Sequence, residues 1–126
     1  MPEERKAPGE MIPLNPVHFH ILLVLLEGER HGYSIVKRVE ERSHGTIRIE
    51  PANLYRSLRR LREQGVIEES ERQPDPALDD SRRRYFQLTL LGERVLRAEA
   101  DRLAHQLEAA RAAGLCPGPG TAGDAP

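Results

Sequence analysis

The stretch over residues 50–65 constrains the fold more than any other part of the sequence. Leu54, Leu58 and Leu61 recur there at positions i, i+4 and i+7, which is the spacing of one apolar face of a helix. A proline near the start and a glycine at the end suit the first turn of a helix and its termination. The sequence therefore predicts an amphipathic helix over residues 51–64 with one buried stripe.

The rest of this predicted helix is polar or basic, with no acidic side chain between residues 53 and 62: Asn53, Tyr55, Arg56, Ser57, Arg59, Arg60 and Arg62. Arginine donates paired hydrogen bonds to phosphate and to guanine, asparagine can bridge adenine, and hydroxyls donate to phosphate. We expect four of these residues to face a DNA major groove, namely Asn53, Arg56, Ser57 and Arg60, and the others to lean toward phosphates. The arginines could instead form an ordinary solvated helix surface with no role in DNA binding. Tyr55 could instead be an aromatic residue that packs at the edge of the core.

Composition limits the other function classes. The chain has 126 residues, which suits one small domain with extensions, and 19 basic against 20 acidic residues, so attraction to nucleic acid must come from local clustering. The single cysteine, Cys116, excludes a disulfide framework and fits a reducing cytosol. The longest apolar run, Ile21–Leu26, is far shorter than the ~20 residues of a membrane span. We expect a soluble, cytoplasmic protein with no membrane segment.

The elements are predicted in the order helix, helix, short strand, helix, hairpin and helix. Asn15 and a following proline predict the start of a helix that ends near residue 27, and a turn over residues 28–32 leads to a second helix. Alternating β-branched residues predict a short strand over residues 46–49. Two further strands, joined by a polar loop, form a wing over residues 66–88. Three helices followed by a wing form a winged helix-turn-helix, whose third helix is the reader.

The last helix has two apolar series. Leu91 and Val95 are expected in the core, whereas a series with alternating steps of four and three residues predicts a coiled-coil seam: Leu96, Ala100, Leu103, Leu107 and Ala110. The first helix is apolar almost all round, so one of its faces, with Phe19 and Leu23, is also expected to meet a partner. A homodimer is the simplest interpretation.

The fold class is therefore predicted to be mainly α (α+β), in four parts. Residues 1–14 are expected to form a flexible arm, residues 15–88 the winged helix-turn-helix domain, residues 89–113 a dimerisation helix, and residues 114–126 a disordered tail rich in proline and glycine.

Basic and aromatic residues of the wing extend the predicted DNA surface. Arginines occupy positions 82 to 84, and strand alternation lets at most two share a face, so we expect Arg82 and Arg84 to reach the DNA backbone or minor groove. Ion pairing within the hairpin is the alternative. The side chains of Tyr85 and Phe86 should point to opposite faces of the strand, so one of them should lie in the core. Tyr33, at the start of the second helix, is expected either to touch a phosphate or to pack.

The five histidines do not form a metal-binding or catalytic pattern. His18 and His20 are two residues apart and lie on different sides of a helix, and the other three lack a paired ligand at a suitable spacing. We expect no metal, no cofactor and no enzymatic activity, and interpret His31 as a turn or cap residue.

Several motifs in fixed order resemble the PadR family of bacterial transcriptional regulators. They are the apolar first helix with its following glycine (residues 21–28), His31-Gly32-Tyr33, the helix over residues 51–64 with Gly65-Val66-Ile67-Glu68, Arg84-Tyr85-Phe86, and Gly92. The resemblance covers residues 21–96. It implies a dimer formed through a single carboxy-terminal helix that binds inverted-repeat operators, usually as a repressor.

Two other function classes stay open. A ligand-responsive sensor would bind a small aromatic inducer at the dimer seam, where Phe19 is the only obvious aromatic candidate and the chain has no tryptophan. A winged-helix module could instead bind protein through its apolar first helix. Steep salt dependence of DNA affinity separates DNA binding from protein docking.

Overall fold

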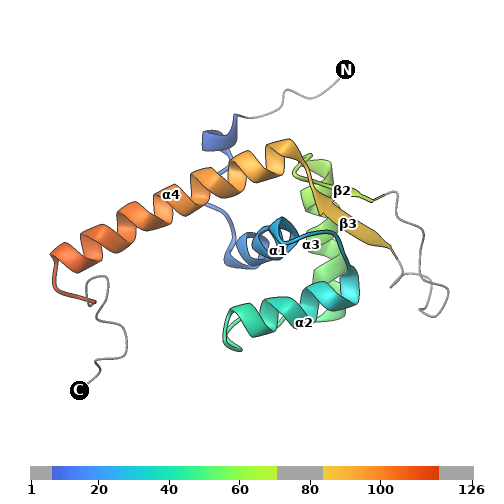
Figure 1. Cartoon of the computed structure of the whole chain (residues 1–126), viewed down its shortest axis with the longest axis horizontal. Helices are drawn as coiled ribbons and strands as arrows, with labels where there is room; N and C mark the ends of the chain where they lie inside the picture. Colours follow the sequence, from blue (N-terminus) through green and yellow to red (C-terminus); the bar gives the residue numbers. More distant parts are fainter. Residues whose placement is uncertain (1–6, 71–83, 117–126) are drawn as a thin grey trace.

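The computed structural model describes residues 7–70 and 84–116, and their arrangement is shown in Figure 1. The elements in chain order are η1 (Pro8–Glu10), α1 (Pro16–Leu26), β1 (Arg30–His31), α2 (Gly32–Arg42), α3 (Pro51–Glu63), β2 (Ile67–Glu69), β3 (Tyr85–Leu88) and α4 (Leu90–Ala112). This is the predicted mainly α winged helix-turn-helix with a long carboxy-terminal helix.

Side-chain caps begin three of the helices. The Asn15 side chain accepts a hydrogen bond from the backbone N–H of Val17 at 2.7 Å, and Thr89 Oγ1 accepts one from Gly92 at 3.0 Å. His31 Nδ1 accepts from the backbone N–H of Ser34 at 3.2 Å, so the interpretation of His31 as a cap residue is confirmed. These caps satisfy backbone donors that the first turn of a helix leaves without a partner.

The wing belongs to a three-stranded antiparallel sheet of order β1-β3-β2. The additional strand, β1, lies in the segment that the sequence predicts as a turn, and it pairs Arg30 with Phe86. β2 and β3 both lie within the wing predicted over residues 66–88. The strand predicted over residues 46–49 is wrong: this segment has no strand beside it, and Ser43 Oγ accepts from the Ile47 N–H at 2.9 Å instead.

Both aromatic residues of β3 are buried, but only Phe86 belongs to the hydrophobic core, as the strand alternation predicts. Phe86 is 4% exposed and lies in the main hydrophobic core, whereas Tyr85 is 8% exposed and its ring meets the His31 ring edge-on at 5.5 Å. Because adjacent residues of a strand point to opposite faces, Tyr85 lies on the face of β3 opposite Phe86, where the His31 ring packs against it.

The hydrophobic core surrounds α1, which lies between α2, α4 and β3 (Figure 1). Its buried members come from every helix and include Ile21, Leu22, Ile35, Leu58, Val66 and Val95. Leu96 is also in this core, at 4% exposure. The sequence places Leu96 on the dimer seam, and this is corrected because contacts within the chain already bury it.

Residues 7–14 are packed against the domain and do not form a free arm. Met11, Ile12 and Leu14 lie against the core, and η1 contacts α4. The backbone N–H of Leu14 donates to Glu99 Oε2 at 3.2 Å. The expectation of a flexible arm therefore fails for this part, because three apolar side chains gain burial here. Residues 1–6 and 117–126, which include the rest of the predicted arm and most of the predicted tail, lie outside the described residues.

The start of α4 is fixed against the junction between α3 and β2. Thr89 donates its backbone N–H to Val66 O at 3.1 Å and its hydroxyl to Gly65 O at 2.6 Å. At Gly92 the helix approaches so closely that an added Cβ would lie 2.0 Å from Val66 O. From this anchored end, α4 extends well beyond the other elements (Figure 1).

Substitution Gly92→Ala is expected to lower the free energy of unfolding by about 1–3 kcal/mol or more, because the added methyl group meets backbone that can move only with α3 or β2. Urea unfolding followed by circular dichroism measures this. Gly9→Ala is the control, because nothing lies within 4 Å of the Cβ it would add. Equal urea midpoints of unfolding for the two variants would contradict the close packing of Gly92 against Val66.

Glu99 joins α4 to the amino-terminal segment and is only 2% exposed. Its carboxylate accepts from Arg102 Nε at 2.7 Å and from a second Arg102 nitrogen at 2.8 Å, besides the Leu14 N–H. The hydrogen bond from Arg102 lowers the pKa of Glu99 below its ordinary value of 4.5 and outweighs burial, which raises it. A carboxyl group whose pKa is lowered in the folded protein stabilises the fold at pH values above its ordinary pKa. This stabilisation is lost as the pH falls through the pKa of the folded state.

Substitution Glu99→Gln should therefore destabilise the protein at pH 7 by about 1–3 kcal/mol, because a partly buried Arg102 loses its charged partner. The variant should also lose less stability than the wild type between about pH 5 and pH 3. Urea unfolding at several pH values measures both effects. If the free energies of unfolding of the two proteins changed in parallel over that pH range, the stabilising role of the Glu99 carboxylate would be refuted.

Candidate nucleic-acid interface

The orientation of α3 follows from its apolar stripe. Leu54, Leu58 and Leu61 are 2%, 2% and 0% exposed, as the sequence predicts. A proline occupies the first helical position, where the missing N–H costs no intrahelical hydrogen bond. Because these leucines face the core, the opposite side of the helix must face outward.

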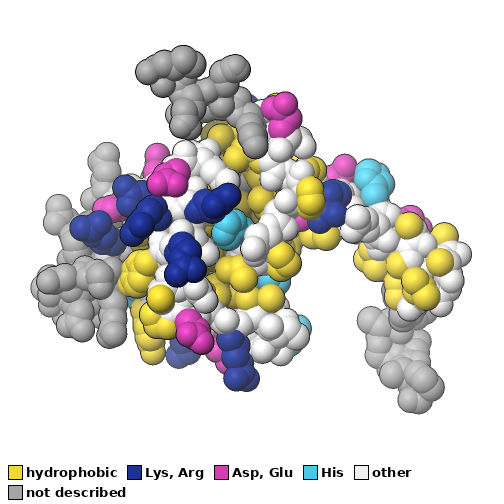
Figure 2. Space-filling model, turned by 180° about the vertical axis from the view of Figure 1, so that it is seen from behind, with side chains coloured by type: hydrophobic (Ala, Val, Ile, Leu, Met, Phe, Trp, Pro, Cys, Tyr) yellow, Lys and Arg dark blue, Asp and Glu magenta, His cyan; other side chains and the backbone are white. Residues whose placement is uncertain are grey.

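The outward side of α3 carries the predicted DNA-contacting residues. Five of them are exposed, namely Asn53, Arg56, Arg59, Arg60 and Arg62, and the other two, Tyr55 and Ser57, are half-buried. Figure 2 looks onto this side of the molecule and shows lysine and arginine side chains gathered on it, with a histidine beside them. Within residues 7–70 and 84–116, no ion pair involves the four arginines of α3.

The four residues predicted to face the groove lie together, and one of the predicted phosphate-contacting residues lies with them. Asn53, Arg56, Ser57 and Arg60 line one hollow, together with Arg59, whereas Tyr55 and Arg62 do not. Tyr55 packs against the core, and its hydroxyl lies 3.4 Å from where a Cβ on residue 32 would be. Tyr55 therefore sits at the edge of the core, the alternative that the sequence leaves open.

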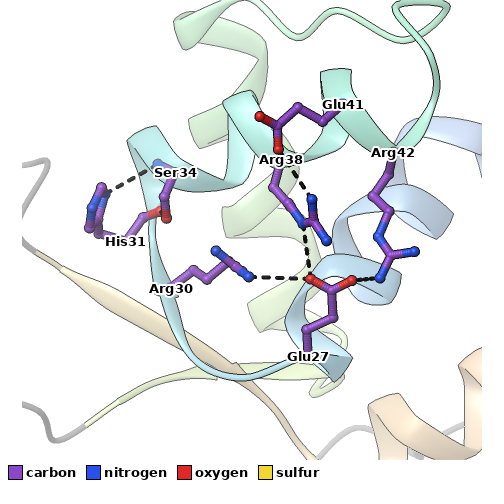
Figure 3. Close-up of polar contacts among 7 residues, drawn as sticks. All are labelled: Glu27, Arg30, His31, Ser34, Arg38, Glu41 and Arg42. Atoms are coloured by element: carbon purple, nitrogen blue, oxygen red, sulfur yellow. Dashed lines mark hydrogen bonds and ion pairs between the residues drawn. The ribbon is translucent and has the colours of Figure 1, made fainter.

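Three other arginines near the helix-turn-helix share ion pairs with Glu27, a residue that the sequence does not mark as functional. Glu27 Oε1 lies 3.2 Å from Arg30 and 3.1 Å from Arg38, and Oε2 pairs with Arg42 (Figure 3). Arg38 also pairs with Glu41 at 3.2 Å. These contacts fix α2 against the end of α1. The spacing of Glu27 and Arg30 is a local signal for one of the pairs, but the other two depend on tertiary structure.

The residues outside α3 that are predicted to contact DNA differ in exposure and in ion pairing. Arg84 is 61% exposed and its guanidinium lies 3.7 Å from Glu69 Oε1, which is the pairing that the sequence analysis leaves as an alternative. Tyr33 is 62% exposed in the first turn of α2. Arg82 lies outside the described residues.

His18 on α1 shares the hollow beside α3 with Arg60. Burial lowers the pKa of this histidine, and the positive charge of Arg60 lowers it further. Burial also lowers the pKa of His20, whose ring meets Phe19 edge-on at 5.5 Å. In the described part of the chain, no group of three His, Cys, Asp or Glu side chains is arranged to hold a metal ion.

The residues expected at a dimer interface lie on two helices. On the projecting half of α4, Leu103 and Leu107 are 36% and 44% exposed, Ala100 is exposed and Ala110 is half-buried. On α1, Phe19 and Leu23 are half-buried. None of the described helices is both long and apolar enough to cross a membrane.

A comparison with known proteins assigns most of the described chain to one protein family. The model of the transcriptional regulator PadR-like family matches residues 21–98. An uncharacterized protein of Lysinibacillus sphaericus is 33% identical over 76 residues, which are 60% of this chain and 67% of that protein.

Solved structures share the fold. A PadR family transcription regulator from Clostridium difficile matches with a TM-score of 0.63 at 20% identity, over 77% of this chain and 96% of its own. RosR from H. salinarum matches with a TM-score of 0.57 at 28% identity, over 79% of each chain.

Proposed function

This chain belongs to the PadR-like family of transcriptional regulators, and we propose that it works as a homodimeric repressor on a pseudo-palindromic DNA operator. The family makes it a DNA-binding regulator and not an enzyme. Repression, the dimer and the operator are our proposal. The observation that supports it best is the group of four arginines on α3 that no described acidic side chain neutralises.

The proposed reading surface is α3 together with the wing over residues 66–88. Asn53, Arg56, Ser57 and Arg60 face the major groove, where arginine pairs with guanine and asparagine with adenine. Phosphates are contacted by side chains at the flanks of α3, in α2 and in the wing: Arg59, Arg62, Tyr33, Arg82 and Arg84. Tyr55 is left out of this set, because it packs at the edge of the core. An α-helix about 10–12 Å across fits the B-DNA major groove of about 12 Å, so both kinds of contact form together.

The proposed dimer forms through the projecting half of α4. Leu103 and Leu107 are exposed there on successive turns, and a helix that projects from its domain gains apolar burial only from a partner. The proposed face also includes Ala100, Ala110, Phe19 and Leu23, and it leaves out the buried Leu96. A twofold arrangement places the two copies of α3 about 34–36 Å apart, in successive major grooves.

Substitutions on α3 test the reading surface. Arg56→Ala and Arg60→Ala should each cost about 1–3 kcal/mol of binding at one base position, whereas Arg62→Ala should weaken binding to all sequences and reduce the salt slope by about 1. Fluorescence anisotropy with operator and random duplexes at several salt concentrations measures these effects. Arg97→Ala on α4 is the control, because it removes an equal charge from a residue outside the proposed DNA-binding surface. Unchanged affinity of both groove variants would show that another surface binds DNA.

Substitutions on α4 test the dimer. Leu103→Asp combined with Leu107→Asp should convert the dimer to a monomer in sedimentation velocity, because two carboxylates would lose hydration at the seam. Leu115→Asp is the control, since Leu115 is 79% exposed and lies beyond the end of α4. Circular dichroism checks that the double variant is folded. A double variant that stays dimeric would place the interface elsewhere.

A further inference from the structure

A hollow lies along one flank of α3, between this helix and the start of α1. Its α3 side carries Asn53, Arg56 and Arg60, and its opposite side carries His18. The segment between α2 and α3 closes one part of it with Arg48. The side chains in the hollow therefore come from three segments that are distant in the sequence.

The charge of this hollow is strongly positive. Arg48, Arg56, Arg59 and Arg60 line it, and Glu63 is the only acidic residue among its described lining. Arg48 has one weak partner, Glu40, at 3.8 Å, and both side chains are largely exposed, at 76% and 48%. An exposed ion pair of this length contributes little, so Arg48 is available to a stronger anionic partner.

The position of the hollow identifies the kind of anion. If α3 lies in a major groove, the sugar–phosphate backbones that border the groove pass along the two flanks of the helix. The hollow is one of these flanks, and it continues the surface of Arg56 and Arg60 without a break. A phosphate that entered the hollow would meet the basic side chains that line it, with Arg48 and His18 among the lining residues.

We propose that the DNA-binding surface extends from α3 across this hollow, and that Arg48 and His18 contact the DNA backbone that borders the groove. This inference rests on the proposed role of α3 in DNA binding. It adds α1 and the α2–α3 connection to the interface. Arg48 supplies a charge that neutralises phosphate, and His18 supplies a ring N–H donor.

His18 makes this contact dependent on pH. In the free protein, burial and Arg60 lower its pKa, so its ring is neutral at neutral pH. The charged groups that face it across the hollow are the four arginines and Glu63. A bound phosphate offsets the positive charge of the arginines and favours the protonated ring, so binding takes up a proton. Affinity for DNA should therefore rise as the pH falls.

The first test compares Arg48→Ala with Arg97→Ala, which is a matched control because both side chains are 76% exposed and both pair with a glutamate. Arg48→Ala should weaken binding several-fold, to the same extent for operator and random duplexes, and reduce the slope of log K against log salt by about 1. Arg97→Ala should change neither. A slope for Arg48→Ala equal to that of the wild type would overturn the proposal for this residue.

The second test follows affinity from about pH 8 to pH 5.5 for the wild type and for His18→Gln, which keeps a donor but cannot titrate in this range. The ratio of wild-type to variant affinity should grow several-fold toward acidic pH. All other groups are the same in both proteins, so their contributions cancel in the ratio. A constant ratio would overturn the role of His18. Circular dichroism confirms that the variant is folded at each pH.

Arg56→Ala separates this inference from the function it rests on. If Arg48→Ala matches its control while Arg56→Ala still loses operator affinity, the extension across the hollow is wrong and the role of α3 stands. If neither variant changes DNA affinity, both the extension and the proposed reading surface are wrong.

Discussion

Burial of the three leucines of α3 is the constraint on which the rest of the interface depends. Each fully buried leucine side chain stabilises the fold by about 1.5–3 kcal/mol relative to an exposed one, so the rotation of α3 about its own axis is firmly set. A helix that presents Leu54, Leu58 and Leu61 to the core presents its arginines to solvent. The basic surface of α3 is thus positioned by apolar packing, and its arginines remain without ion pairs in the described structure.

Two further contacts place α3 relative to its neighbours. Glu27 holds α2 against the end of α1 through Arg38 and Arg42, and the close approach at Gly92 holds α4 against the junction of α3 and β2. In the proposed dimer, a shift at Gly92 would change the separation of the two copies of α3. The fold therefore links the packing of one residue to the spacing of the operator half-sites.

The helices were predictable from the sequence because periodicity and capping are local. The helix predicted over residues 51–64 ends one residue earlier in the structure, and the last helix differs by one residue at each end. The errors concern features that depend on distant partners. β1 forms because β3 lies beside it, whereas residues 46–49 alternate in sequence but have no neighbouring strand. Leu96 continues the spacing of the seam, yet the core of its own chain already buries it. The basic face of α3 could be predicted, but the hollow beside it could not, because its other side comes from α1.

Selection from a pool of random duplexes at two salt concentrations, followed by sequencing of the bound DNA, tests the central claim most directly. A homodimer that reads DNA through α3 predicts enrichment of an inverted repeat whose half-sites are about one helical turn apart, with enrichment that persists at the higher salt concentration. Recovery of no preferred sequence, with binding lost at moderate salt, would contradict the claim. It would mean that the arginines of α3 attract DNA without reading it.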